Sequence, residues 1–261
     1  MSGKEQALRS RAALAKHFPS IATELERRCQ INASVIVENG EAIDISIDGK
    51  PVYGGNARRF AAGQVEAYLK KPLRFFLQRL DLSGMVTGVG WRLIGEIDKG
   101  LRANEFGETT TQPSDNPTFL IIFGLGLGHH VEELVRQTKA RWLIIVEPLV
   151  EFIEHSCEVV DWGALTERFE SQGGSIHFIT ESDPHSIVRM ISGVFSSKGV
   201  PYADGSWVFT HYPHWAFTEA RDELHGAIEF IFVNRDFFSL AGYNFRHHNP
   251  VESSCARLFH R

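Results

Sequence analysis

The most informative segment of the chain is residues 119–130, which read FLIIFGLGLGHH. Its five leading apolar residues, with Thr118 before them, form a run at 118–123 that is typical of a strand buried on both faces of a parallel sheet. Three alternate glycines follow, Gly124, Gly126 and Gly128, and helical spacing of apolar residues begins directly after them. Glycine at such a turn permits a tight backbone and the close approach of a ligand. The segment therefore predicts a strand, a glycine loop and a helix of a Rossmann-like fold.

The same alternation continues toward the carboxyl terminus. Further buried strands are expected at 142–146, 175–180 and 206–210, with helices between them. Strands and helices that alternate at this spacing indicate parallel βαβ units with right-handed crossovers. We therefore expect an α/β fold with a mostly parallel, methyltransferase-like sheet over residues 118–234, followed by an irregular tail at 235–261.

The first hundred residues have a different pattern, typical of a smaller α+β domain. Helical spacing on both sides of Phe18-Pro19 predicts two helices, because proline is tolerated in a first helical turn. Short alternating segments flank Asn-Gly at 39–40 and Asp-Gly at 48–49, which favour tight hairpin turns and predict a three-stranded meander. Helix is expected again over 56–80, with an interruption at Lys70-Lys71-Pro72. The polar stretch 108–117, with two prolines, is the expected linker after an N-terminal domain of residues 1–107.

Polar side chains follow the predicted strands, at the sheet edge where ligand sites form in parallel sheets. Glu147 ends the second strand, 21 residues after Gly126, and an acidic side chain there can accept hydrogen bonds from ribose hydroxyls. Asp183 and His211 follow the third and fourth strands. The predicted cofactor-binding residues are Gly124, Gly126, Gly128, His130, Glu147, Asp183 and His211. No catalytic residue is predicted.

Each of these assignments has a structural alternative. The glycines could serve only to let helix and strand pack closely, and Asp183 could cap the next helix with Pro184 at its first position. A metal site from His130, His211 and His214 is conceivable, since imidazole is a common ligand. The spacing from 211 to 214 falls in a loop that contains a proline, however, and no metal site is predicted.

The glycine spacing also limits the choice of cofactor. His129 stands where the dinucleotide fingerprint requires its third glycine. Gly-x-Gly-x-Gly instead resembles the first motif of class I S-adenosylmethionine-dependent methyltransferases, in which the acid after the second strand binds ribose. That family usually has an acid two places before the first glycine, where this chain has Ile122. The cofactor expected here is S-adenosylmethionine or a nucleotide, including a nucleotide sugar.

Composition excludes several classes of protein. The 261 residues are 43% hydrophobic and 23% charged, as in an ordinary globular protein, and the net charge of −5 argues against a dedicated nucleic-acid binder. The longest apolar run is too short for a membrane span. Three cysteines and a charged start without an apolar signal sequence favour a reduced compartment, so we expect a cytoplasmic protein.

The order of these features resembles the N-terminal half of the motility accessory factor family of bacterial flagellin glycosyltransferases. This family is related to archaeal 6-hydroxymethylpterin pyrophosphokinase-like proteins. Its members typically have three alternate glycines, Tyr-His, and then a strand ending in Glu-Pro. The corresponding residues here are Gly124, Gly126, Gly128, His130, Glu147 and Pro148, with His129 in place of the tyrosine. The resemblance covers about residues 10–240, and its specific part is residues 119–150.

The resemblance implies a role in flagellin or surface glycosylation. Full-length members continue into a sialyltransferase-like domain, which is thought to transfer an activated nonulosonic acid to flagellin. That domain has its own Gly-x-Gly-Pro-Ser loop, which this chain lacks, so no catalytic residue carries over. We expect a Rossmann-like module that is non-catalytic by itself, with flagellin or a separate catalytic domain as partner.

Two other functions stay open at this point. The first is an S-adenosylmethionine-dependent methyltransferase, with His211 or His214 as base; the second is a metal-dependent hydrolase, which rests only on the number of histidines. Neither nucleic acid nor membrane is an expected partner. The phenylalanines of residues 230–238 suggest a homo-oligomer, with burial in the core as the simpler explanation.

Overall fold

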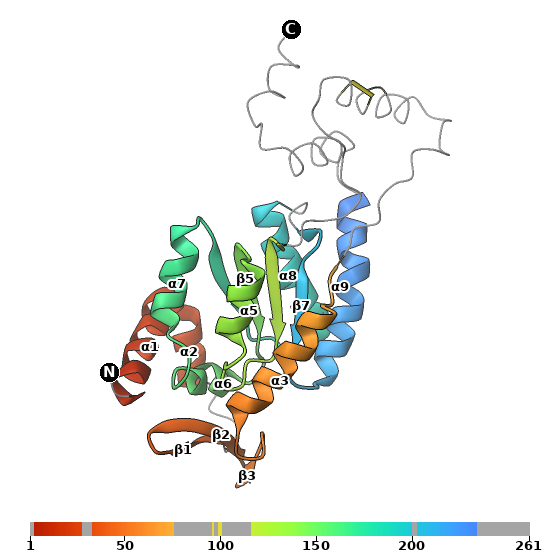
Figure 1. Ribbon diagram of the computed structural model, residues 1–261. Coiled ribbons are helices and arrows are strands. Elements are labelled where there is room, and N and C mark those ends of the chain that lie inside the picture. Colours follow the sequence, from red (N-terminus) through yellow and green to blue (C-terminus); the bar gives the residue numbers. More distant parts are fainter. Residues whose placement is uncertain are drawn as a thin grey trace.

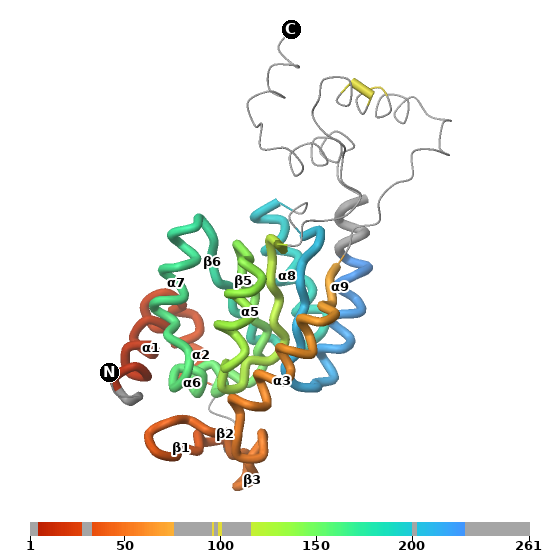
Figure 2. Tube along the Cα trace, in the orientation of Figure 1, coloured from red at the N-terminus to blue at the C-terminus, as the bar shows by residue number. Residues whose placement is uncertain are grey.

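A computed structural model describes residues 3–27, 33–75, 96, 99–100, 116–199 and 203–233 of the chain, and the side chains within 5–227 of these (Figures 1 and 2). All but the last two residues of the expected linker at 108–117, and the whole expected tail at 235–261, lie outside the described residues. So do the side chains of the phenylalanines at 230–238. The domain boundaries therefore stay a prediction.

A four-stranded parallel sheet forms the centre of the molecule, and it confirms the expected Rossmann-like architecture. Its strands are β4 (Phe119–Phe123), β5 (Trp142–Val146), β6 (Ser175–Ile179) and β7 (Trp207–Thr210), in the order β6-β5-β4-β7. The helices that follow them are α5 (Val131–Thr138), α6 (Val150–Ser156), α7 (Trp162–Ser171), α8 (Pro184–Lys198) and α9 (Trp215–Val233). All four strands run in one direction, so their carboxyl ends meet at one edge.

Helices cover both faces of this sheet and give a three-layer sandwich. Along β4, Leu120 and Ile122 belong to a core cluster that includes residues of α5, α6 and α7. The alternate residues, among them Ile121, belong to a second cluster formed with α8 and α9. Both faces of the central strands are apolar and buried, which is why these strands consist almost entirely of large apolar residues.

The N-terminal part supplies two helices, a small antiparallel sheet and a third helix. These are α1 (Gly3–His17), α2 (Pro19–Arg27), β1 (Ala33–Glu38), β2 (Glu41–Ile47), β3 (Lys50–Pro51) and α3 (Ala57–Lys70). The expected break at Pro19 and the three-stranded meander are both present. Asn39 and Asp48 have positive φ, as do the glycines after them, which is the geometry of the predicted hairpin turns.

Two helices end where the sequence or a neighbouring element limits them. Helix α3 ends at Lys70, at the interruption that Lys70-Lys71-Pro72 predicted, because the residue before a proline avoids helical geometry. The segment after β5 forms helix α6, which ends at Ser156, and a separate helix α7 begins at Trp162. Asp161 caps α7 through a hydrogen bond from the Ala164 N–H to its side chain.

The N-terminal helices belong to the same core as the parallel sheet. Leu14 of α1, Ile21 of α2 and Val65 of α3 are buried in the cluster that covers one sheet face. Helix α1 lies beside α7 in Figures 1 and 2, and the buried Ser10 hydroxyl donates to the carbonyl of Val160 at 2.7 Å. The N-terminal segment is therefore an integral layer of the fold in its described residues.

The meander lies across the carboxyl edge of the parallel sheet, at the bottom of Figure 1. Ile45 of β2 is fully buried in a small third cluster with Leu127 of the glycine loop and Phe152 of α6. This is the edge at which ligand sites form in parallel sheets. The meander thus packs directly onto the predicted site.

Candidate functional site

The glycine loop connects β4 to α5 and has the backbone geometry that the sequence predicted. Gly124, Gly126 and Gly128 all have positive φ, and the Gly124 N–H donates to the carbonyl of Val146 on the neighbouring strand. A Cβ on Gly124 would stand 2.6 Å from the ring of Tyr212, and one on Gly128 would stand 2.7 Å from Val160. Both distances are too short for a side chain. The chain itself therefore fills the space in front of these glycines.

Tyr53 from the meander fills the space in front of the middle glycine. Its hydroxyl oxygen is the atom that a Cβ on Gly126 would strike first. The same hydroxyl lies 3.0 Å from Nε2 of His211, and the Tyr53 ring packs against Phe60 of α3. Tyr53 is thus wedged between the glycine loop and the loop that follows β7.

Glu147 is fully buried, with both carboxylate oxygens turned toward the protein. Oε2 accepts the Leu125 N–H at 2.7 Å and, more weakly, the Gly126 N–H at 3.4 Å. Oε1 accepts the Leu149 N–H at 3.0 Å and the Tyr212 hydroxyl at 2.6 Å. Burial raises the pKa of Glu147 to about 7, although these donors act in the opposite direction. The carboxylate therefore holds the glycine loop, and its role as a ribose acceptor stays a prediction.

His211 has a fixed orientation and a fixed tautomer. The Gln64 side-chain amide donates to the His211 carbonyl at 2.7 Å, which leaves its oxygen to accept from Nδ1 of His211 at 2.7 Å. Nδ1 therefore carries the hydrogen, and Nε2 accepts the Tyr53 hydroxyl. Burial, together with the nearby His129, lowers the pKa of His211 to about 4. The ring is neutral at physiological pH and already engaged on both nitrogens.

His130 stacks directly on this ring. The two imidazole centroids are 4.2 Å apart, with 28° between the planes, and His130 is fully buried. Burial, and then the neighbouring His211, lower the pKa of His130 well below its ordinary value. His130 and His211 thus form a neutral aromatic pair beneath Tyr53.

Asp44 fixes the position of Tyr53. Its buried carboxylate accepts four backbone N–H groups: Ile45 at 2.7 Å, Val52 at 3.0 Å, Tyr53 at 2.9 Å and Gly55 at 2.5 Å. A carboxylate that accepts several backbone hydrogen bonds can hold an otherwise irregular loop in one conformation. Asp44 therefore determines where residues 51–55 place the Tyr53 ring.

The structure brings together most of the predicted site residues, but not all. The three glycines, His130, Glu147 and His211 lie within one connected set of contacts. Asp183 is exposed and caps α8 by accepting the Ser186 N–H at 2.8 Å, with Pro184 next in the helix. This contact is the structural alternative that the sequence allowed.

Four residues at the site were missed by the sequence reasoning: Asp44, Tyr53, Gln64 and Tyr212. Tyr212 stands beside His211 in the sequence and could have been included on that ground. The other three lie 60 or more residues before the glycine loop, and nothing in their spacing connects them to it.

Neither a metal centre nor a membrane helix is apparent in the part of the chain that the structure describes. Within it, no group of three or more His, Cys, Asp or Glu side chains is placed to hold a metal ion. His214 is half-buried, outside any such group. None of the described helices is long and apolar enough to cross a bilayer.

Comparison with known families decides the affiliation of the chain. The family model described as "Glycosyltransferase Maf N-terminal domain" matches residues 11–233. The chain belongs to this family. The resemblance to motility accessory factor proteins, seen first in the glycine loop and the Glu147-Pro148 pair, is thereby confirmed.

A solved Maf structure has the same fold. The structure of the Maf glycosyltransferase from Magnetospirillum magneticum AMB-1 superposes with a TM-score of 0.68 at 22% sequence identity. The match covers 88% of this chain and 35% of that protein, so the chain spans about a third of its length. A search of the curated proteins found no match.

Proposed function

We propose that this chain is a non-catalytic Rossmann-like module that acts in flagellin glycosylation together with a separate catalytic domain. The observation that carries the proposal is the family match over residues 11–233, which concerns the N-terminal domain of Maf glycosyltransferases. Flagellin and the catalytic domain are the proposed partners, and the cytoplasm is the proposed location.

The contacts of the glycine loop support a module without chemistry of its own. Catalysis needs a nucleophile, base or cofactor cradle that substrate can reach. Here Glu147 occupies the loop N–H groups, Tyr53 covers Gly126, and His211 is neutral with both ring nitrogens engaged. In this arrangement the loop serves to join the meander to the parallel sheet.

The methyltransferase alternative keeps one specific observation in its favour. The Gly-x-Gly-x-Gly spacing and an acid at the end of the second strand are both present, at Gly124–Gly128 and Glu147. S-adenosylmethionine could bind there only if Tyr53 left the loop and the Glu147 carboxylate turned outward. A nucleotide or nucleotide sugar at the same place would need the same rearrangement.

Two assays with the purified chain test the proposal. Unglycosylated flagellin is immobilised and binding of the chain is measured with and without the separately expressed sialyltransferase-like domain of a Maf protein. Transfer of a cytidine-activated nonulosonic acid to flagellin is then followed by mass spectrometry. We expect binding to flagellin or to the added domain, and transfer only when that domain is present. Transfer by the chain alone, or binding to neither partner, would overturn the proposal.

A ligand titration separates the methyltransferase alternative. S-adenosylmethionine, S-adenosylhomocysteine and cytidine monophosphate are each titrated calorimetrically into the wild type and into Glu147→Gln, with the exposed Glu66→Gln as the matched control. We expect no binding heat in any of them. Micromolar binding of an adenosyl ligand by the wild type and the control, lost in Glu147→Gln, would instead establish a cofactor site.

A further inference from the structure

The hydroxyl group of Tyr53 lies between a hydrogen-bond acceptor and a donor of the glycine-loop site. Its oxygen stands beside the place of a Cβ on Gly126, 3.0 Å from Nε2 of His211. The backbone N–H of Leu127 hydrogen-bonds to the same oxygen. The side chain therefore contributes more than bulk, because its one polar atom pairs with two groups of the site.

The roles of these two groups are fixed. Gln64 keeps the hydrogen of His211 on Nδ1, so Nε2 can only accept. A backbone N–H can only donate. An atom that pairs with both must give one hydrogen and accept another, as a hydroxyl oxygen does. A carboxylate or an ionised phosphate has no hydrogen to give to Nε2.

The electrostatics of the pocket act in the same direction. Burial raises the pKa of Tyr53, and the carboxylates of Glu147 and Asp44 raise it further. A negatively charged oxygen is therefore disfavoured at this point. The pocket beneath Tyr53 thus selects an uncharged hydroxyl group, although its glycine loop resembles a phosphate-binding loop in sequence.

The ring of Tyr53 lies between aromatic neighbours and close to solvent. Its centroid is 5.3 Å from that of Phe60 and 5.5 Å from that of His211. Phe60 is 44% exposed, and Tyr53 itself is half-buried. Asp44 holds the backbone on both sides of Tyr53, so the side chain can rotate outward while residues 51–55 keep their place. A ring that enters from solvent then meets the same two aromatic neighbours.

His130 gives an independent indication of a ligand site. It is fully buried and stacks on His211 with 4.2 Å between the ring centroids. Neither of its ring nitrogens has a hydrogen-bond partner among the described residues. Buried polar atoms of folded proteins are nearly always paired, and the exceptions are often functional. The imidazole stacked on His211 is such an exception.

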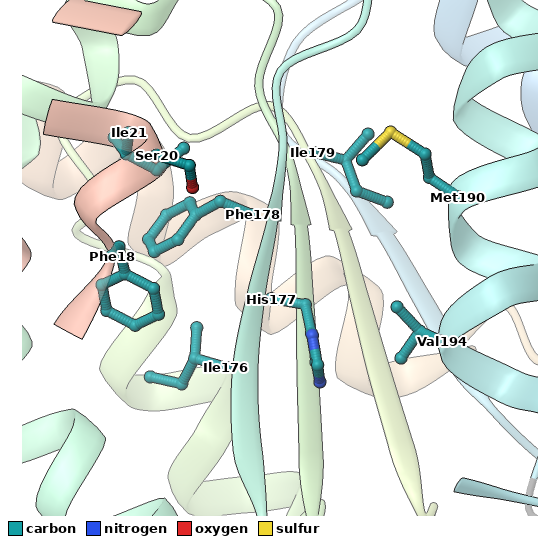
Figure 3. Close-up of a pocket in the computed structure, with 9 residues that line it drawn as sticks. All are labelled: Phe18, Ser20, Ile21, Ile176, His177, Phe178, Ile179, Met190 and Val194. Carbon is teal, nitrogen blue, oxygen red and sulfur yellow. The ribbon is translucent and has the colours of Figure 1, made fainter. Parts of the chain in front are cut away.

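A second hollow in the described part of the chain has no comparable polarity. It measures about 230 Å³, runs along β6 and is lined mainly by apolar side chains, among them Phe18, Ile179 and Met190 (Figure 3). Its two polar side chains are Ser20 and His177, and Nε2 of His177 already pairs with a serine hydroxyl of the same strand. No donor and acceptor with fixed roles specify a ligand there.

We propose that the pocket beneath Tyr53 binds an uncharged aromatic ring that carries a hydroxyl group, and that Tyr53 is its resident occupant, displaced when such a ligand enters. The tethered tyrosine competes with any free ligand at a high effective concentration, so the pocket is closed in the resting protein. The proposal goes beyond the role in glycosylation. It is tested without flagellin or a second domain, so it holds or fails independently of that role.

A titration with three small aromatic probes tests the proposal. The probes are para-fluorophenol, fluorobenzene, which lacks the hydroxyl group, and para-fluorobenzoate, which carries a negative charge instead. Each is titrated by fluorine NMR into the full-length wild type, Tyr53→Phe and Tyr53→Ala, with circular dichroism as the check on folding. Tyr53→Phe keeps the ring and removes the hydroxyl group, whereas Tyr53→Ala removes the whole occupant.

We expect the affinity for para-fluorophenol to increase from the wild type to Tyr53→Phe and again to Tyr53→Ala. The first step should be roughly tenfold, because the resident ring loses its hydrogen bonds, and the second should be larger, because the ring no longer competes. Tyr53→Ala should prefer para-fluorophenol over fluorobenzene by roughly tenfold or more and should not bind para-fluorobenzoate. Equal binding of the first two probes, or binding of the benzoate, would overturn the proposal.

Displacement is tested separately from selectivity. If Tyr53→Phe binds para-fluorophenol no better than the wild type, the resident ring does not leave and the proposal fails. This comparison also decides the matter if Tyr53→Ala does not fold, since Tyr53→Phe retains the packing of the ring.

The positioning role of Gln64 gives a last test. Gln64→Met has nearly the same shape but leaves Nδ1 of His211 without its acceptor. In the Tyr53→Phe background it should reduce the preference for para-fluorophenol over fluorobenzene by roughly tenfold, because Nε2 is no longer held as an acceptor. Glu66→Gln, on the exposed side of the same helix, is the matched control and should leave the preference unchanged. A preference that survives Gln64→Met would contradict the assigned polarity of the pocket.

Discussion

The buried carboxyl group of Glu147 makes a sharp prediction about stability and pH. Its pKa is raised from 4.5 to about 7 in the folded protein, chiefly by burial. A group with a raised folded pKa contributes stability that is fully present below its unfolded pKa and is lost as pH rises through the folded pKa. A pKa raised from 4.5 to about 7 corresponds to about 3 kcal/mol, and most of this loss falls between pH 5 and pH 8.

Glu147→Gln removes the titration while keeping the shape of the side chain. The glutamine NH₂ group must face one pair of donors, either the loop N–H groups or those of Leu149 and Tyr212. That conflict lowers the free energy of unfolding equally at both pH values, so it cancels in a comparison of pH dependence. We expect the wild type to lose about 2–3 kcal/mol more than Glu147→Gln between pH 5 and pH 8.

The assay is urea unfolding of both proteins at pH 5 and pH 8, followed by tryptophan fluorescence and circular dichroism. Every other titrating group is shared by the two proteins and drops out of the difference. Glu66→Gln serves as the control, because Glu66 is exposed on α3 and pairs with Lys70. If the wild type and Glu147→Gln showed the same pH dependence, the inferred burial of a titrating carboxyl group beside the glycine loop would be refuted.

Three other changes have expected outcomes at defined contacts. Gly126→Ala should lower the free energy of unfolding by about 1–3 kcal/mol, because it strains a positive φ and strikes the Tyr53 hydroxyl. The double variant with Tyr53→Phe should recover part of this loss in denaturation experiments. Full additivity of the two changes would contradict the contact. Asp44→Ala should cost about 2–4 kcal/mol and accelerate amide exchange at Gly55, as seen by hydrogen-exchange mass spectrometry or NMR, because four backbone donors lose their acceptor. Asp183→Ala should lower the free energy of unfolding by about 1 kcal/mol, measured by thermal unfolding, because a helix cap is lost. Partner binding should not change. A loss of binding without a loss of stability would show that Asp183 belongs to the functional site.

The sequence predicted the parallel sheet well because its signals are local. The two central strands are continuous apolar runs bounded by turn residues, and β4 was expected at 118–123 and is found at Phe119–Phe123. The hairpin turns depend on dipeptides whose preference for positive φ acts within two residues. Such features can be inferred without knowing what packs against them.

The contacts over the glycine loop could not be predicted in the same way. Gln64 and His211 are 147 residues apart, and Tyr53 and His211 are 158 residues apart. No local pattern specifies such pairs, since they depend on how the meander lies against the finished sheet. The sequence identified the loop and Glu147, but whether they face a ligand or the protein depends on Tyr53 and Tyr212, which come from other elements.

Because α1 packs against residues near α7, it cannot complete its packing until a segment synthesised much later has emerged. The Gln6 side chain donates to the carbonyl of Val159, and Ser10 contacts Val160, across about 150 residues of sequence. A ribosome adding 5–20 residues per second needs roughly ten to thirty seconds to deliver those partners after α1 has emerged. During that interval the apolar side of α1, including Leu14, has no core to join. Expression of residues 1–107 alone should therefore yield an insoluble product, because the partners of α1 are absent from that fragment.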